Sequence, residues 1–266
     1  MIDDLLHNAR ELASAYPASS IRGVGVSIGG PLDAAHGIIH SPPNLPGWDN
    51  IPLRQILEQK LSLPVNVHHD AAACAIAEHR WGAARGLDHL AYLTCGTGFG
   101  VGLILAGRVH YGANGHNCEI GHARYRDDGP EAFGKRGSLE AYCAGSSLTR
   151  LAAWKFPVRW QKYPPSPPQI ADLARQGDPD AAAVITLNAV ATGQTCAMLA
   201  DLLFPQLIVL GSLAIHLGES WLAQVRQTYL AEALPQAAKV CPVVPAGLGD
   251  RLQDLSALAA APMHSN

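Results

Sequence analysis

The chain has 266 residues, enough for one large domain or two smaller ones and for a core that needs neither disulfides nor a structural metal. Hydrophobic residues make up 48% of it and charged residues 15%, which excludes a disordered tail and a coiled coil. The formal net charge is −3, and no run of Lys or Arg stands out. We therefore expect no nucleic-acid partner through this chain.

Neither a membrane nor a secretion signal is indicated. No stretch approaches 18 consecutive apolar residues, and the first residues, MIDDLLHNAR, lack a basic-then-apolar pattern. The six cysteines are scattered without a CxxC pair, which is typical of reduced thiols. We expect a cytoplasmic protein with no membrane partner.

The first predicted element is an amphipathic helix, because apolar residues recur at helical spacing from Ile2 to Tyr16. The string IRGVGVSI (21–28) predicts a buried strand that ends at the turn Gly29-Gly30-Pro31. SPPNLPGW (41–48) holds three prolines and a glycine, so we expect a fixed loop there. A short helix is predicted for 53–61, with Pro52 in a suitable first-turn position.

The next segments predict two strands around a turn. A strand over 64–67 is followed by an alanine-rich helix from Asp70 toward Trp81. LAYLTC (90–95) and VGLIL (101–105) then predict two strands joined by the glycine-rich turn GTGFG. Turn signals at 106–107 and 112–115 extend this pattern to a β-meander.

Helices dominate the rest of the chain. Residues 124–137 have little periodicity and predict an irregular surface loop, whereas 139–154 predicts a helix. The proline-rich segment 157–169 predicts a connecting loop. Asp178 and Pro179 supply a cap and a first-turn proline for a long apolar helix that reaches about Phe204.

A strand and turn over 206–212 and a helix over 221–234 complete the predicted elements. Strands alternate with helices throughout, which predicts an α/β protein with substantial parallel pairing.

The strongest chemical signal is the glycine-rich turn between the two strands. It runs Thr94-Cys95-Gly96-Thr97-Gly98-Phe99-Gly100. Glycines permit positive φ and a close approach of the backbone to a ligand. Successive N–H groups with a threonine hydroxyl then form a concave site that suits phosphate. An ordinary β-hairpin turn is the alternative interpretation.

A second signal is Asp70, which follows a strand, opens a helix and is preceded by His68 and His69. An aspartate in that position is often only a helix cap. A carboxylate at the carboxyl end of a strand also lies where α/β sheets bind ligands. There it could accept the proton of an attacking hydroxyl in phosphoryl transfer.

A third signal comes from GHNCEIGH and SLEAY, which carry Glu119, His122 and Glu140. Carboxylates and imidazole offer the directional acceptors that read the hydroxyls of a sugar. Each could instead be a surface residue, and Glu140 could be a solvated first-turn charge.

Together these segments resemble the ROK family of sugar kinases and sugar-responsive repressors, within the actin-like ATPase superfamily. The matching strings, in the family's order, are GVGVSIGGPLD, PPNLPGW, LPVNVHHDAAA, LTCGTGFGVGLILAGRVHYGANG, EIGH, GSLEAY with Gly145, LFPQLIVLGS and LGDRLQDLSALAAA. The resemblance covers nearly the whole chain.

The resemblance implies a two-lobed actin-like ATPase (ribonuclease H-like) α/β fold with mixed sheets. A sugar-side lobe would span 1–89, with the final helix, 252–266, returning to pack on it. A nucleotide-binding and dimerisation lobe would span 90–251. Members of the family usually form dimers or dimers of dimers, so a homodimer is expected.

The resemblance also implies roles for matching residues. Asp70 would be the catalytic base that deprotonates a sugar hydroxyl for attack on ATP. The implied sugar-side residues are Gly30, Asn44, His69, Glu119, His122 and Glu140. The implied nucleotide-side residues are Thr94, Gly96, Thr97, Gly98 and Gly100, which form the second phosphate loop, and Gly211 and Ser212 near the adenosine. Mg²⁺ would accompany the ATP.

The chain departs from the family pattern at its start. The family begins with a strand and a phosphate loop of the form DxGGT, whereas this chain begins within the helix that follows. We therefore expect an N-terminal lobe without its first strands, through a start codon assigned too late or a truncated relative. Loss of that loop should lower both catalysis and stability.

Two further departures concern the sugar side. The family's zinc motif CxCGxxGC is replaced by EAFGKRGS, with Glu131, Phe133 and Ser138 at the cysteine positions. We expect no structural zinc, because four ligands are needed, and a substitute set from His116, Cys118, His122 and Cys143 is a remote alternative. The family's asparagine before the catalytic aspartate is here His69, which is bulkier and titrates near pH 6.5.

The sequence therefore predicts an ATP-dependent kinase that phosphorylates a hydroxyl of a hexose or an N-acetylhexosamine. The alternative is a catalytically impaired sugar-binding relative from the sensor or regulator branch. A truncated product that folds poorly is a third possibility. The identity of the sugar and of the hydroxyl, and dimer against tetramer, stay open.

Overall fold

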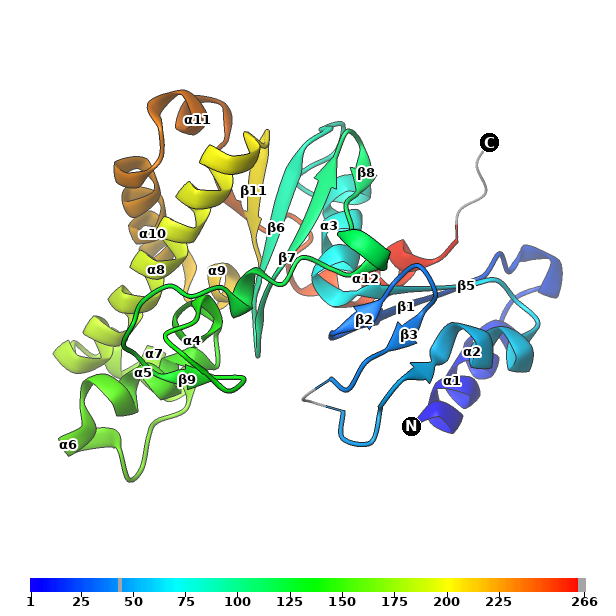
Figure 1. Ribbon diagram of the computed structural model, residues 1–266, viewed down its shortest axis with the longest axis horizontal. Helices are drawn as coiled ribbons and strands as arrows, with labels where there is room; N and C mark the ends of the chain where they lie inside the picture. The colour runs from blue at the N-terminus through cyan, green and yellow to red at the C-terminus, as the bar shows by residue number, and fades with distance from the viewer. Residues whose placement is uncertain (43–44, 263–266) are drawn as a thin grey trace.

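A five-stranded mixed sheet organises the larger part of the molecule (Figure 1). The computed structural model describes residues 1–42 and 45–262. The strand order is β12-β11-β6-β7-β8, with bounds β6 (Leu90–Cys95), β7 (Phe99–Leu105), β8 (Arg108–Val109), β11 (Leu207–Leu210) and β12 (Val243–Pro245). β11 runs parallel to both β6 and β12, and β6, β7 and β8 form an antiparallel meander. The predicted α/β class with mixed sheets, parallel pairing and a meander is confirmed.

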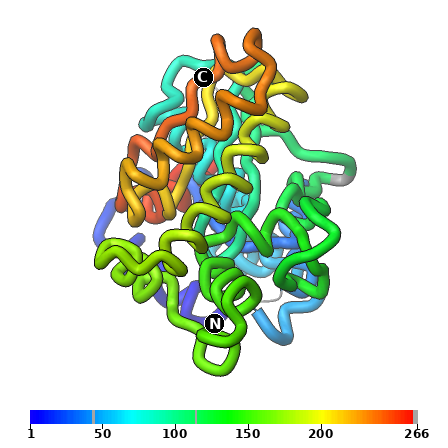
Figure 2. Tube along the Cα trace, turned by 90° about the vertical axis from the view of Figure 1, so that its left-hand side faces the viewer, coloured from blue at the N-terminus to red at the C-terminus, as the bar shows by residue number. Residues whose placement is uncertain are grey.

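Helices cover both faces of this sheet. Successive side chains of a strand point to opposite faces, so Leu90 and Tyr92 pack with one layer and Ala91 and Leu93 with the other. The first layer contains α3 (Asp70–Trp81) and α12 (Leu252–Ala260). The second contains α4 (Leu139–Cys143), α5 (Ser147–Lys155), α8 (Pro179–Leu203) and α10 (Gly218–Glu232), of which α8 and α10 lie toward the viewer in Figure 2. Burial on both faces explains why these strands are apolar without alternation.

The central helix of the second layer is α8. Its N-cap Asp178 accepts hydrogen bonds from the N–H groups of Asp180 and Ala181, as the predicted cap requires. α8 is long and apolar enough to cross a membrane, yet 56% of its most apolar window is buried inside this protein. The amide of Asn188 bridges the layer, because it donates to the carbonyl of Tyr142 and accepts from Nε1 of Trp221 at 2.9 Å. These contacts identify α8 as a core helix of this protein.

The N-terminal part, residues 1–69, has smaller sheets. β1 (Val24–Ile28) pairs in parallel with β5 (Val65–His69). β2 (Leu32–Asp33), β3 (Ile38–Ile39) and β4 (Ile51–Pro52) form a separate antiparallel sheet. Helices α1 (Ile2–Ser14) and α2 (Leu53–Leu61) pack beside them. Every residue of β1 is only half-buried.

Helix α12 joins the N-terminal part to the sheet part, because it packs on both α3 and β1. A Cβ added at Gly25 of β1 would lie 2.2 Å from the carbonyl oxygen of Ala257, so only glycine fits this crossing. Arg80 of α3 donates to the carbonyl of Ala259 at 2.6 Å.

The buried carboxylate of Glu78 also fixes the C-terminal end of α3. It accepts hydrogen bonds from the N–H groups of Ala83, Gly247 and Leu248. The end of α3 is therefore tied to the segment that returns the chain to α12.

Several short elements differ from the predicted ones. The loop expected over 124–137 contains a hairpin of β9 (Glu131–Ala132) and β10 (Lys135–Arg136). The helix expected over 139–154 is divided into α4 and α5, and the loop expected over 157–169 contains α6 (Pro157–Trp160) and the start of α7 (Pro167–Arg175). The remaining elements are η1 (Ala18–Ser20), η2 (Ala113–Gly115), η3 (Ile120–His122), α9 (Leu213–His216), α11 (Pro235–Val240) and η4 (Gly249–Arg251).

All six cysteines are free thiols. Five of them are buried, and Cys118 is half-buried.

Candidate functional site

Several of the predicted sugar-side residues lie near the first turn of α3. β5 alternates, so Val65, Val67 and His69 are buried while Asn66 and His68 are half-buried. Helix α3 begins directly after His69, which places Asp70 at the carboxyl end of a parallel strand. Such an end is where α/β sheets bind ligands.

The side chain of Asp70 is 46% exposed and therefore accessible to a substrate. Its Oδ1 accepts a hydrogen bond from the N–H of Ala71 at 2.6 Å and lies 3.1 Å from Nδ1 of His69. Asp70 is the first residue of the helix, and the cap position belongs to His69. The carboxylate is thus held at one oxygen by its neighbours.

The imidazole of His69 lies between Gly30 and Gly100. A Cβ added at Gly30 would lie 2.7 Å from Cδ2 of the ring, and one added at Gly100 would lie 3.4 Å from Cε1. The same Cβ at Gly30 would lie 3.3 Å from Oε1 of Glu119. Gly30, His69 and Glu119 therefore meet at one place, although they come from separate segments.

His68 points elsewhere. Its Nδ1 is hydrogen-bonded to the hydroxyl of Tyr111, and the two rings stack with centroids 6.0 Å apart. Burial lowers the pKa of His68 to about 4, so its ring is neutral near pH 7. This contact ties β5 to the segment that leads toward Glu119.

Glu140 approaches the same region from α4. It is 8% exposed, and its Oε2 accepts a hydrogen bond from the N–H of Phe99 at 3.4 Å. Burial raises the pKa of Glu140 to about 7, an effect that Arg150 partly offsets and Glu119 increases. Glu140 is therefore a buried group that titrates near neutral pH, rather than a solvated helix charge.

The residue that holds α4 in place is Ser138. Its Oγ accepts a hydrogen bond from the N–H of Ala141 at 3.2 Å and caps the helix. Ser138 stands at one of the positions where the zinc motif has cysteine.

The glycine-rich turn is built by close packing. None of Gly96, Gly98 and Gly100 has a positive φ, so the positive φ expected there was wrong. A Cβ added at Gly98 would lie 3.6 Å from Oε2 of Glu140, and one added at Gly100 would lie 3.4 Å from the ring of His69, so the backbone of the turn lies against both groups. The turn therefore connects the carboxylate of α4 to the strand end at Asp70.

The predicted nucleotide-side residues also lie together. A Cβ added at Gly96 would lie 3.5 Å from Oγ of Ser212 and 3.9 Å from Oγ1 of Thr94. Gly211 is buried after β11, and its N–H donates to the carbonyl of Leu93. Thr97 is exposed at the tip of the turn.

Two predicted sugar-side residues are not drawn into these contacts. His122 is exposed, and within the described residues its hydrogen bonds are those of its backbone: its N–H donates to the carbonyl of Glu119 at 3.1 Å, and its carbonyl accepts from Nζ of Lys135 at 2.6 Å. Asn44 lies outside the described residues.

The sequence analysis missed Arg150 and Ser146. Nη2 of Arg150 donates to Oγ of Ser146 at 2.9 Å, and that hydroxyl donates to the carbonyl of Thr97. A single arginine in a predicted helix has no distinguishing pattern, although the string GSSLTR follows directly on the segment that carries Glu140.

A metal cage is not evident in the part of the chain that the structure describes, where no group of three His, Cys, Asp or Glu residues could hold an ion. Cys143, one of the remote alternative ligands for zinc, is buried and hydrogen-bonded to Thr195. The β9–β10 segment is closed by a backbone contact in which the N–H of Gly137 donates to the carbonyl of Pro130 at 2.9 Å.

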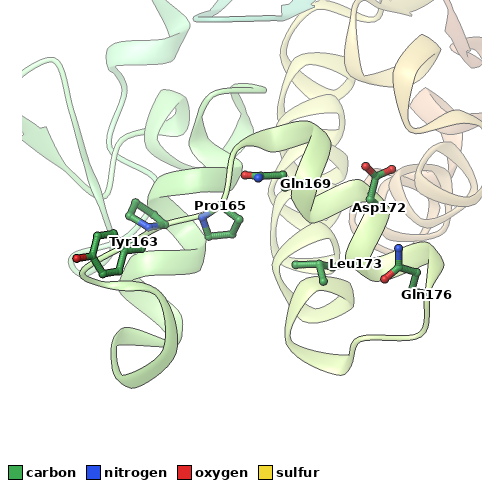
Figure 3. Close-up of a pocket in the computed structure, with 7 residues that line it drawn as sticks. Tyr163, Pro165, Gln169, Asp172, Leu173 and Gln176 are labelled. Atoms are coloured by element: carbon green, nitrogen blue, oxygen red, sulfur yellow. The ribbon is translucent and has the colours of Figure 1, made fainter.

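A hollow of about 520 Å³ lies apart from this site, on α7 and the loop before it (Figure 3). It is lined by Tyr163, Pro164, Pro165, Gln169, Asp172, Leu173 and Gln176. None of the predicted site residues contributes to it.

Comparisons with known proteins point to one family. The sequence pattern of the ROK family matches residues 1–262. The chain is 29% identical over 239 residues to a xylose repressor of Caldicellulosiruptor bescii, covering 85% of this chain and 59% of the repressor.

Two solved structures are similar over almost the whole fold. A ROK hexokinase from Thermus thermophilus has a TM-score of 0.83 and 33% identity, over 97% of this chain and 85% of the hexokinase. A ROK family glucokinase from Streptomyces griseus, in complex with glucose and AMPPNP, has a TM-score of 0.80 and 28% identity, over 97% and 86% of the two chains. The fold is accordingly the actin-like ATPase fold.

Proposed function

This chain belongs to the ROK family, and from that premise we propose that it is an ATP-dependent sugar kinase. It would transfer the γ-phosphate of ATP to a hydroxyl of a hexose or an N-acetylhexosamine. The observation that carries the proposal is that His69 and Glu140 both lie against the glycine-rich turn from Thr94 to Gly100, with Asp70 beside His69 and Glu119 near the same ring at Gly30.

In the proposed reaction Asp70 is the general base. Its accessible oxygen takes the proton of the sugar hydroxyl as that oxygen forms a bond to the γ-phosphorus. The bond between the γ-phosphorus and the bridging oxygen breaks, and ADP leaves. The hydrogen bond from Ala71 keeps the carboxylate oriented throughout.

Glu119, Glu140 and His69 would bind the sugar. Carboxylate oxygens accept hydrogen bonds from hydroxyls, and an ionised acceptor makes the stronger bond. A sugar that donates to Glu140 would favour the carboxylate over the acid form. His122 stays a predicted ligand, since its ring is exposed and available.

The nucleotide would be ATP, with its phosphates on the glycine-rich turn and its adenosine near Gly211 and Ser212. Successive backbone N–H groups suit phosphate oxygens. The described residues form no cage for a metal ion. Mg²⁺ would therefore enter with the nucleotide, and we assign this chain no ligand for it.

We extend the proposal to the assembly and the site of action. Two lobes, 1–89 with the last helix and 90–251, would close over the sugar, and two copies of the chain would form a homodimer. Free thiols and a need for ATP both favour the cytoplasm. Light scattering of the purified chain tests the dimer directly.

The second candidate function is sugar sensing without catalysis. It is favoured by the similarity to a xylose repressor and by His69 at the family's asparagine position. A sensor needs the sugar-side contacts but no phosphoryl transfer.

The test is an assay of sugar-dependent ADP release from Mg²⁺ and ATP, run across a panel of hexoses and N-acetylhexosamines. We expect one class of sugar to be phosphorylated. Asp70→Asn should lower kcat by about 100-fold or more, since a positioned base contributes about 10²–10⁴-fold. Asp172→Asn, an exposed carboxylate of α7, is the matched control and should be fully active.

The kinase proposal is wrong if no sugar stimulates ADP release, or if Asp70→Asn is as active as the wild type. Calorimetry then separates the two functions. Sugar binding without nucleotide binding would support the sensor, and tight ATP binding would oppose it.

A further inference from the structure

Arg150 is a cation with an incomplete set of partners beside the glycine-rich turn. Nη2 contacts Ser146, but Nε is buried and has no hydrogen-bond partner among the described residues. Arg150 is also absent from the ion pairs found in the described part of the chain. Arg150 as a whole is half-buried, and a partly desolvated guanidinium group without a counter-ion is costly, which points to an anion that arrives from outside.

The position on α5 adds to this cost. Arg150 lies in the first turns of α5 and reaches back to the N-cap residue Ser146. A helix N-terminus carries a partial positive charge, so a cation there is repelled and an anion is attracted. Burial also lowers the pKa of Arg150, in the direction expected for a cation that is poorly compensated.

The contacts aim Arg150 at the phosphate side of the site. Oγ of Ser146 donates to the carbonyl of Thr97, and the N–H of Ser146 donates to the carbonyl of Gly96. The guanidinium group is therefore linked to the tip of the turn through the hydroxyl of Ser146. The neighbouring carboxylate is Glu140, which is close enough for its charge to act on Arg150 but does not pair with it.

We propose that Arg150 binds the phosphate oxygens of the nucleotide through the terminal N–H groups of its fork, which are not enclosed as Nε is. The inference rests on the proposed function, and it adds a side-chain cation to a loop that otherwise offers backbone donors. A guanidinium group suits this role because its planar fork matches the geometry of a phosphate.

A purely structural role makes a different prediction. If Arg150 only ties Ser146 to Thr97, removal of either partner should have the same effect. The hydroxyl of Ser146 already accepts from Arg150 and donates to Thr97, so it has little left for a ligand. Ser146→Ala therefore breaks the tie and leaves the cation in place.

The experiment is calorimetry of ADP and ATP binding to the 266-residue chain in the presence of Mg²⁺. Arg150→Met, which keeps the apolar stem, should weaken both affinities by about 10- to 100-fold, the range for a hydrogen bond to a charged group. Arg150→Lys should have affinities between those of Arg150→Met and the wild type. Ser146→Ala should change the affinities for ADP and ATP by less than about threefold. Arg175→Met, on an exposed arginine of α7, should match the wild type.

Thermal unfolding without ligand provides the second measurement. Arg150→Met should melt at the same temperature as the wild type or higher, because it removes an uncompensated cation. If Arg150→Met fails to fold, the test rests on Arg150→Lys. The inference then requires that Arg150→Lys bind ADP more weakly than Ser146→Ala does.

Three results would overturn the inference. In the first, Arg150→Met binds ADP as well as the wild type does; in the second, it loses no more affinity than Ser146→Ala. Both leave the kinase proposal standing if sugar-dependent turnover is observed. In the third, the wild type binds neither ADP nor ATP, which removes the proposed kinase as well.

Discussion

The sheet part and the N-terminal part differ in how completely their strands are covered. β6 and β11 have helices on both faces, and almost every residue in them is buried. β1 pairs only with β5 among the described strands, and all five of its residues are half-exposed. The sheet part is thus covered on both faces, whereas the N-terminal part has a smaller buried cluster of its own and packs its half-exposed β1 against α12.

This difference separates two kinds of site residue. Glu140 and the glycine-rich turn belong to the well-covered core and are held by its packing. Gly30 follows β1 and His69 ends β5, and the main helix contact of β1 is α12. In the proposed site, the glycine-rich turn and Glu140 would therefore be preorganised, whereas Gly30 and His69 would be more adaptable.

Two alanine substitutions, one in each part, give the strongest test of the difference in coverage between the sheet part and the N-terminal part. Trp221→Ala removes a fully buried ring and leaves Asn188 without its donor, so the free energy of unfolding should fall by about 3–5 kcal/mol. Val26→Ala in half-exposed β1 should cost about 1 kcal/mol or less. Denaturant unfolding measures both, and equal losses would remove the distinction between the two parts.

The contact between α12 and β1 can be broken directly. Gly25→Ala places a Cβ against Ala257 and should cost about 2 kcal/mol through overpacking. Hydrogen exchange should then show that β1, β5 and α12 lose protection before β6 and β11. Gly29→Ala, with no atom within 4 Å of its added Cβ, is the control and should leave exchange unchanged. Uniform loss of protection in Gly25→Ala would contradict this picture.

The buried carboxyl group of Glu140 should make the stability of the folded chain depend on pH. The pKa of Glu140 is raised from 4.5 to about 7, so between these values the folded chain holds a proton that the unfolded chain has released. Wild-type stability should therefore fall as the pH rises from 4.5 through 7. The free energy of unfolding of Glu140→Gln should exceed that of the wild type by about 1–3 kcal/mol at pH 8 and equal it near pH 4.

The matched control for Glu140 is Glu119→Gln, which changes the charge equally at an exposed position. Its effect on stability should be smaller. A Glu140→Gln curve that runs parallel to the wild type from pH 4 to pH 8 would show that burial does not govern this group.

The smallest expected effect concerns the helix that carries Glu140. Ser138→Ala removes the cap of α4 and should lower the free energy of unfolding by about 1 kcal/mol. Because the cap orients Glu140, sugar affinity should fall with it in calorimetric titrations. Unchanged stability together with unchanged affinity would mean that core packing alone positions α4.

Elements with strong local signals could be predicted from the sequence. The helix expected from Pro179 to about Phe204 ends at Leu203, because its cap and its apolar length are both encoded locally. The strands around the glycine-rich turn were also predicted, since two buried faces produce continuous apolar runs.

Elements determined by distant contacts could not be predicted. The expected helix over 139–154 is broken near Ser146, whose N–H bonds Gly96 instead of continuing the helix. Glu140 was a candidate from its sequence context, but its burial depends on the packing of α4 against α8. Arg150 was missed because its missing counter-ion is visible only in three dimensions.

The uneven burial of the thiols has a practical consequence. Cys118 precedes Glu119, and the other five cysteines are enclosed in the core. An alkylating reagent should therefore mark Cys118 first, slowly because burial raises the pKa of that thiol. Protection of this single position by an added carbohydrate would report, by mass spectrometry and without any engineered label, that the carbohydrate binds near Glu119.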